Sequence, residues 1–237
     1  DLGRSFRSPI EVRQAIVARL PVTLELTVLA LVLAIMLAIP LGILAALYPG
    51  SRWDLSISGF AVITLSIPNF WLGIILIYLF ALNLRWLPSA GFVPLTVDPV
   101  GNLKCMVLPS LTLAAAYTGS FVRYTRSVML DVLAQDYIRT ARAKGLYPAS
   151  VIRGHALPNG LIPIVTVIGL ELAGLFGGAV VTETVFSLPG VGTLLIQAIL
   201  GRDLPMVQGV ILFIVGAVVV TNLITDVAYE YLDPRVR

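Results

Sequence analysis

The charged side chains that could take part in recognition gather in one segment of this chain, residues 136–163. Four of the 16 Lys and Arg residues of the chain lie there, together with its one histidine: Arg139, Arg142, Lys144, Arg153 and His155. A histidine can act as a pH sensor or a metal ligand. No second histidine exists and Cys105 is far away in sequence, so a structural or docking role is favoured for His155.

Motifs for nucleotide hydrolysis and for hydrolytic catalysis are missing from the sequence. The only lysines, Lys104 and Lys144, follow Leu103 and Ala143, whereas the phosphate-binding loop of ATPases requires glycine before its lysine. The sequence contains neither His-Glu-x-x-His nor Gly-x-Ser-x-Gly. The chain is therefore not expected to be an enzyme, and an intramembrane protease or lipid-modifying enzyme has no visible catalytic group.

The composition is that of an integral membrane protein. The chain is 58% hydrophobic and 12% charged, against about 45–50% apolar and about 25% charged residues in soluble domains. Its mean hydropathy is +0.95. The net charge of +3 is too small to indicate a nucleic-acid partner. Cys105 is the single cysteine, so no internal disulfide is possible.

Five apolar blocks predict five membrane-spanning helices, since a span needs about 20 apolar residues. They cover residues 21–47, 55–82, 107–122, 161–186 and about 206–229. The third is rich in small and hydroxylated residues and is predicted to face protein or water. Pro40 and Pro68 lie inside the first two blocks, where we expect them to kink the helices. The fold class is therefore an all-α polytopic membrane protein.

The distribution of basic residues predicts the orientation of these spans. A cytoplasmic C-terminus puts most of them inside (Arg52, the six between residues 123 and 153, Arg235 and Arg237) and few outside (Arg85, Lys104 and Arg202). Residues 1–20 then form an extracytoplasmic arm, and its four arginines conflict with the rule unless the arm ends a longer translocated segment. We therefore expect the natural chain to carry a sixth, preceding span. Ser8, Pro9 and Glu11 predict a short surface helix in the arm.

Residues 123–160 then form a cytoplasmic loop with two short helices. The first is predicted over residues 131–144, with Gly145 as its stop. Pro148 begins the second, and Pro158 predicts a break at Leu157 before the next span. Two interpretations of this basic helix pair remain: an anchor beside anionic headgroups, or a docking element for a partner.

The same loop resembles the cytoplasmic signature of permease subunits in bacterial ABC importers. That signature reads Glu-Ala-Ala, three residues, Gly, nine residues, Ile-x-Leu-Pro. Gly145, Leu157 and Pro158 match it, Ala141 is the only match to the Glu-Ala-Ala group, and His155 replaces the Ile. "YIRTARAKG" and "HALPNGLIP" are similar to the dipeptide, oligopeptide and nickel branch. The resemblance extends to "GGAVVTETVFSLPGVG", "RDLPMVQGV", "YLDPRVR" and "DLGRSF", and so covers the chain.

This resemblance implies one transmembrane permease domain, residues 1–237, in the bacterial inner membrane. Its partners would be a homologous second permease subunit, two ATP-binding cassette subunits, an extracytoplasmic binding protein and membrane lipid. The chain itself would bind no cofactor, and ATP and Mg would be held by the ATPases. The residues implied in ATPase coupling are Arg139, Thr140, Ala141, Arg142, Gly145, Leu146, Tyr147, His155, Leu157 and Pro158. Ala141 and Gly145, four residues apart, are expected to share a face that permits close docking.

The translocation path is predicted from polar residues within the spans, because such residues face a bundle interior or water. Glu171 and Asn222 are the candidates. Glu183, near the outer end of the fourth block, fits an interhelical hydrogen bond as well. The implied function is half of an ATP-driven import path for di- or oligopeptides. Nickel or glutathione import by the same architecture, and an ion-driven transporter or channel, are the alternatives.

Overall fold

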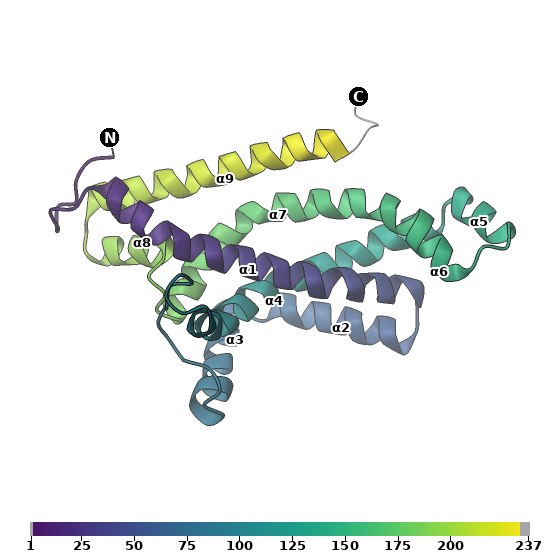
Figure 1. Ribbon diagram of the computed structural model, residues 1–237, viewed down its shortest axis with the longest axis horizontal. Helices are drawn as coiled ribbons and strands as arrows, with labels where there is room; N and C mark the ends of the chain where they lie inside the picture. Colours follow the sequence, from purple (N-terminus) through teal and green to yellow (C-terminus); the bar gives the residue numbers. More distant parts are fainter. Residues whose placement is uncertain (1, 233–237) are drawn as a thin grey trace. The chain divides into compact units, whose positions relative to one another are not determined.

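The computed structural model describes the backbone of residues 2–232, and within it the side chains other than those of residues 173, 226 and 228–232. Arg235 and Arg237, used above for orientation, lie outside this part. The regular elements of the described residues are helices (Figure 1): α1 Val12–Leu47, α2 Arg52–Ser66, α3 Asn69–Leu76, η1 Ile77–Asn83, α4 Pro99–Leu133, α5 Asp136–Ala143, α6 Pro148–Val151, η2 Ile152–Ala156, α7 Leu157–Val185, α8 Val191–Leu200 and α9 Leu204–Leu232. The all-α prediction is confirmed for this part.

The described helices include four that are long and apolar enough to cross a membrane, or five if the pair formed by α2 with α3 and η1 makes one span. The four lie within α1, α4, the segment from α6 into α7, and α9. Three of them cover all or most of the predicted blocks 21–47, 107–122 and 206–229, whereas the span Pro148–Leu172 overlaps the predicted block 161–186 only in part.

The prediction that the third span faces protein is confirmed. In α4, 61% of the most apolar window is buried inside the chain, against 28% in α1 and 11% in α9. Its small and hydroxylated residues, including Thr112, Thr118 and Thr125, are buried. Small side chains allow close helix approach, and α4 has the most buried window of the four helices.

The second block is broken rather than kinked, which corrects the expectation of a continuous helix across Pro68. α2 ends at Ser66 and α3 begins at Asn69, with Pro68 in an extended conformation (φ −62°, ψ 133°). Proline lacks the amide that would continue the hydrogen-bond ladder and disfavours helical geometry in the residue before it. At Pro40, by contrast, α1 continues without interruption.

The chain divides into two compact units, and each is described by itself. The first comprises residues 1–33, 67–115 and 172–221. Its core joins the start of α1 to α8 and the start of α9, through Val12, Ile16, Val191, Leu194, Ala198, Met206 and Val210. The predicted separate surface helix in residues 1–20 is wrong, because α1 begins at Val12 and runs on to Leu47 as one helix.

The arm before α1 is held to the turn between α8 and α9 by Asp203. Ser5 Oγ donates a short hydrogen bond to Asp203 Oδ2, and the Phe6 amide donates one of 3.1 Å to Oδ1. Burial raises the pKa of Asp203, but these hydrogen bonds lower it by more, so the pKa lies below its ordinary value. The carboxylate is therefore ionised at neutral pH and keeps its hydrogen bonds.

The second unit comprises residues 34–66, 116–171 and 222–237. Its core packs α5, α6 and η2 against the C-terminal parts of α1 and α4, through Ala46, Met129, Ile138, Ala141, Val151 and Ala156. Figure 1 shows α5 and α6 beyond the end of α4. The short helices of the loop therefore pack on α1 and α4 and share their core.

Candidate functional site: a coupling segment and a polar helix face

The segment from α5 to η2 presents a turn whose geometry depends on one glycine. α5 ends at Ala143, and Gly145 follows with φ +80°, while its amide donates to the Arg142 carbonyl at 3.0 Å. Pro148 occupies the first turn of α6. The predicted helix stop and helix start are therefore both present. The predicted beginning at residue 131 is wrong, since α4 continues to Leu133 and α5 starts at Asp136.

Most of the residues proposed for ATPase coupling lie on the outside of this segment. Tyr147 at the turn is 84% exposed, and Leu146 beside it is 42% exposed. Also exposed are Arg139, Thr140, Arg142, Gly145, His155 and Pro158, whereas Leu157 is half-buried. The segment therefore offers an apolar tip surrounded by basic and hydroxyl side chains.

Ala141 does not belong to this outer surface, which corrects its predicted place on a docking face. It is 7% exposed and packs in the core with Ile138, Met129 and Val151. Ile138 and Ala141 are three residues apart and form the inward face of α5. Gly145 lies in open space, since a Cβ built there would meet no atom within 4 Å. Ala141 therefore packs in the core, whereas Gly145 allows the positive φ of the turn.

The predicted break before the fourth span is also absent. α6, η2 and α7 follow one another without interruption from Pro148 to Val185. Pro158 lies directly after the wider turns of η2, which relieve the clash that its ring would make with a regular helical turn. His155 is exposed on η2, and its carbonyl accepts a hydrogen bond of 2.8 Å from the Asn159 side chain. Movement of the exposed segment would therefore pass directly into α7.

The two predicted path residues lie on different helices of the second unit. Glu171 on α7 and Asn222 on α9 are both half-buried. The carboxylate of Glu171 interacts electrostatically with the phenol of Tyr117 on α4. Among the described residues, no group of three His, Cys, Asp or Glu side chains is placed to hold a metal ion.

An ion pair in the second unit was missed by the sequence analysis. Arg126 Nε and Nη2 donate to the two carboxylate oxygens of Asp54 at 2.6 and 2.7 Å, and the Gly50 amide donates to the same carboxylate at 2.9 Å. Asp54 is 4% exposed. This bidentate pair joins the start of α2 to α4. The partners are 72 residues apart, and no local pattern links them.

A buried carboxyl group organises the turn between α7 and α8 in the first unit. Glu183 is fully buried and accepts hydrogen bonds from Thr23 Oγ1 at 2.6 Å and from the Thr193 amide at 3.0 Å. Thr23 Oγ1 in turn accepts one from the Val191 amide at 2.9 Å. Side chains at Gly190 or Gly192 would collide with this carboxylate. The interhelical hydrogen bond predicted as one role of Glu183 is therefore present.

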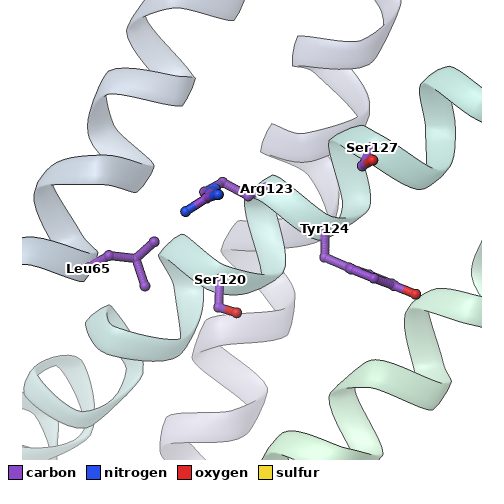
Figure 2. Close-up of a pocket in the computed structure, with 5 residues that line it drawn as sticks. All are labelled: Leu65, Ser120, Arg123, Tyr124 and Ser127. Atoms are coloured by element: carbon purple, nitrogen blue, oxygen red, sulfur yellow. The ribbon is translucent and has the colours of Figure 1, made fainter.

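A cavity of about 420 Å³ follows one face of α4 in the second unit and was not predicted. It is lined by Ser120, Arg123, Tyr124 and Ser127, with Leu65 of α2 opposite (Figure 2). A second cavity of about 280 Å³ is lined by Ser58, Val62, Arg123 and Arg126. Arg123 lines both. The sequence could have indicated this face, because Ser120 lies three residues before Arg123 and Ser127 four residues after it.

Long apolar helices with an exposed, basic helix pair between two of them define a polytopic membrane protein. Residues 38–237 match the family described as binding-protein-dependent transport system inner membrane component. The chain therefore belongs to this family of inner-membrane, multi-pass permease subunits.

Relatives that match along the whole chain are peptide permeases by name. A putative peptide transport system permease protein of Brucella abortus (strain 2308) is 47% identical over 237 residues, covering 100% of this chain and 76% of the relative. The oligopeptide transport system permease protein AppB of Bacillus subtilis (strain 168) is 42% identical, with 100% and 76% covered. The dipeptide transport system permease protein DppB of Escherichia coli (strain K12) is 41% identical, with 100% and 77% covered.

Solved structures share the fold. An inward-facing structure of the MetNI methionine ABC transporter gives a TM-score of 0.78 at 19% identity, covering 93% of this chain and 97% of that chain. An amino acid ABC transporter with histidines gives 0.67 at 14% identity, with 94% of each chain covered. At such identities the likeness concerns the fold alone.

Proposed function

We propose that this chain is a permease subunit of an ATP-driven importer of di- or oligopeptides, in which it forms half of the translocation path. The observation that carries this proposal is the 41–47% identity to peptide permeases over the full length of the chain. The family makes a binding protein and ATPase subunits its partners. In detail, a second homologous permease subunit, two ATPases on the cytoplasmic side and an extracytoplasmic binding protein complete the complex.

The segment Asp136–Ala156 is the contact with the ATPases in this proposal. Its support is the exposed tip of Leu146 and Tyr147 on a segment that is anchored inward by Ile138, Ala141 and Val151. An apolar tip fits a groove on a partner, and the surrounding arginines orient the docking. Because the same segment packs on α1 and α4 and continues into α7, it acts as a lever on the second unit.

Uptake by the assembled complex tests the proposed function. The permease pair, the ATPases and the binding protein are reconstituted in proteoliposomes, and uptake of radiolabelled dialanine is measured with and without ATP. We expect ATP-dependent accumulation. Nickel or glutathione import remains the second candidate, and the ligand that the purified binding protein retains decides it: retention of nickel or glutathione in place of peptide would overturn the peptide assignment.

A further inference from the structure

Arg123 is a cation without a counter-ion in the described part of the chain. No acidic group there lies within 4.0 Å of it, whereas Arg126, one turn along α4, is held by both oxygens of Asp54. Arg123 is exposed in the isolated chain and lines both cavities beside α4. Figure 2 shows Arg123 and Leu65 directed into the same space from α4 and α2. Of these two arginines, Arg126 has Asp54 as its counter-ion, and Arg123 has none among the described residues.

The residues around Arg123 form a polar face on a helix that crosses the membrane. Ser120, Tyr124 and Ser127 follow one another at intervals of four and three residues, which places them on one side of α4. Leu65 is the one apolar side chain among the five that line the larger cavity. Hydroxyl groups donate hydrogen bonds to anions and tolerate water. The arginine and the hydroxyl groups of this lining can bind a small, negatively charged ligand.

The cavity is longer than the reach of a lipid headgroup bound at the interface. α2 begins at Arg52 and Trp53, and Trp53 is 64% exposed; tryptophan marks the membrane interface. Arg123 lies three residues, about 4.5 Å, along α4 from Arg126, which pairs with Asp54 beside Trp53. The cavity continues past Arg123 to Leu65, about 20 Å along α2 from Arg52. The cavity therefore extends from near the interface into the span, as a path for a water-soluble ligand requires.

We infer that Arg123, with Ser120 and Ser127 at three and four positions from it, is a binding site for the carboxylate of the peptide in transit. This inference rests on the proposed peptide function and adds a site to it. The guanidinium fork matches a carboxylate with two hydrogen bonds. Every linear peptide carries the same terminal carboxylate, so one arginine recognises substrates irrespective of their side chains. The site is open, and an open site binds weakly enough to release its ligand, as a conduction path requires.

The test compares matched charge variants in the complete complex with its ATPases and binding protein. Arg123→Gln removes the charge, Arg123→Lys keeps it without the fork, and Arg52→Gln is the control that removes an exposed charge of the same unit outside the cavities. We expect Arg123→Gln to lower dialanine uptake about tenfold, the usual scale for a lost charged hydrogen bond. Arg123→Lys should recover part of the uptake, and Arg52→Gln should equal the wild type. ATP hydrolysis and subunit assembly should be unchanged in all three.

Three results would overturn the inference. Equal uptake by Arg123→Gln and the wild type would show that the charge of Arg123 has no role in uptake. A defect seen in vesicles with phosphatidylglycerol but not in pure phosphatidylcholine would assign Arg123 to anionic headgroups. Loss of assembly in Arg123→Gln would assign it to subunit contact. If the wild type itself takes up no di- or oligopeptide, the proposed function fails and the inference with it, so the two failures are distinguishable.

Thiol labelling tests the same site with Arg123 intact. Ser120→Cys is introduced on a Cys105→Ala background, which leaves a single thiol. We expect a membrane-impermeant, negatively charged thiosulfonate to label this cysteine in the complex, and dialanine to slow the labelling while dialanine amide does not. A cysteine that the reagent does not reach, or that dialanine does not protect, would contradict a water-filled carboxylate site.

Discussion

At the scale of single residues, the buried polar groups explain why certain turns keep their shape. Glu183 receives hydrogen bonds from Thr23 on α1 and from the start of α8, so one carboxyl group joins three helices of the first unit. Buried acceptors without partners are costly, and the turn at Gly190 closes around the carboxylate because no side chain stands in the way. Glu183 is therefore a structural residue of this unit.

Removing the Glu183 side chain should destabilise the protein. Glu183→Ala leaves the Thr23 hydroxyl and the Thr193 amide without their acceptor and opens a cavity, a loss of about 2–4 kcal/mol. Thr184→Ala is the matched control, since Thr184 is exposed and bonds only to the Val180 carbonyl of its own helix. Thermal unfolding of the purified complex should show a clearly lower Tm for Glu183→Ala alone. Equal Tm values for the two variants would contradict this role.

The sequence could not have predicted these residue pairs. The bonded partners Thr23 and Glu183 are separated by 160 positions, and Asp54 and Arg126 by 72. Periodicity and composition describe one helix at a time, whereas such pairs depend on how helices pack. Glu183 could be assigned only to a set of roles, and Arg123 counted only as one of several basic residues near the cytoplasmic side.

At the scale of elements, the apolar blocks predicted the helices well and their ends less well. Hydropathy determines which segments are transferred from water, so the positions of α1, α4 and α9 follow from it. What happens at a proline depends on whether neighbouring helices and side chains replace the lost hydrogen bond. Pro40 is accommodated, Pro68 breaks its block, and Pro158 follows the wide turns of η2 inside a continuous helix. The three prolines look alike in sequence.

The exposed turn between α5 and α6 gives a prediction at this scale. Gly145→Val puts a β-branched residue at φ +80°, a strain of about 1–2 kcal/mol, and adds bulk where the turn would meet the ATPases. Gly50→Val is the matched control, because Gly50 also has a positive φ (+73°) and open space around it but lies outside the segment Asp136–Ala156. We expect both variants to insert and express normally, and only Gly145→Val to lose ATPase association and uptake. Arg142→Ala, which removes a peripheral charge, should have a smaller effect.

The opposite outcome would revive the interpretation of this segment as a basic membrane anchor. A Gly145→Val complex that retains its ATPases and its uptake would mean that the turn does not touch them. Binding of the variant and wild-type chains to vesicles of increasing phosphatidylglycerol content would then measure the anchor directly. If the segment instead contacts the ATPases, the Gly145→Val and wild-type chains should bind these vesicles equally, because their basic residues are the same.

At the scale of the whole molecule, the coupling segment and the polar face of α4 belong to the same compact unit. The inward residues of α5 and α6 pack on Met129 of α4, and Arg123 lies less than two turns before Met129 on the same helix. The ion pair of Asp54 with Arg126 holds α2 to this stretch of α4. A displacement of the exposed tip would therefore reach the Arg123 cavity through one continuous helix, without passing through the first unit.

In the proposed mechanism the energy for that displacement comes from the ATPases, which gives the last prediction. Neither lysine of this chain is preceded by the glycine that an ATP-binding loop needs, so the purified chain alone should hydrolyse no ATP above background. In the reconstituted complex, dialanine uptake should stop when the ATPases are omitted and should continue when ionophores collapse the proton and sodium gradients. A secondary transporter would behave in the opposite way, because its driving force is the gradient and its path lies in the permease alone. Uptake that survives loss of the ATPases but not of the gradients would refute the ATP-driven mechanism.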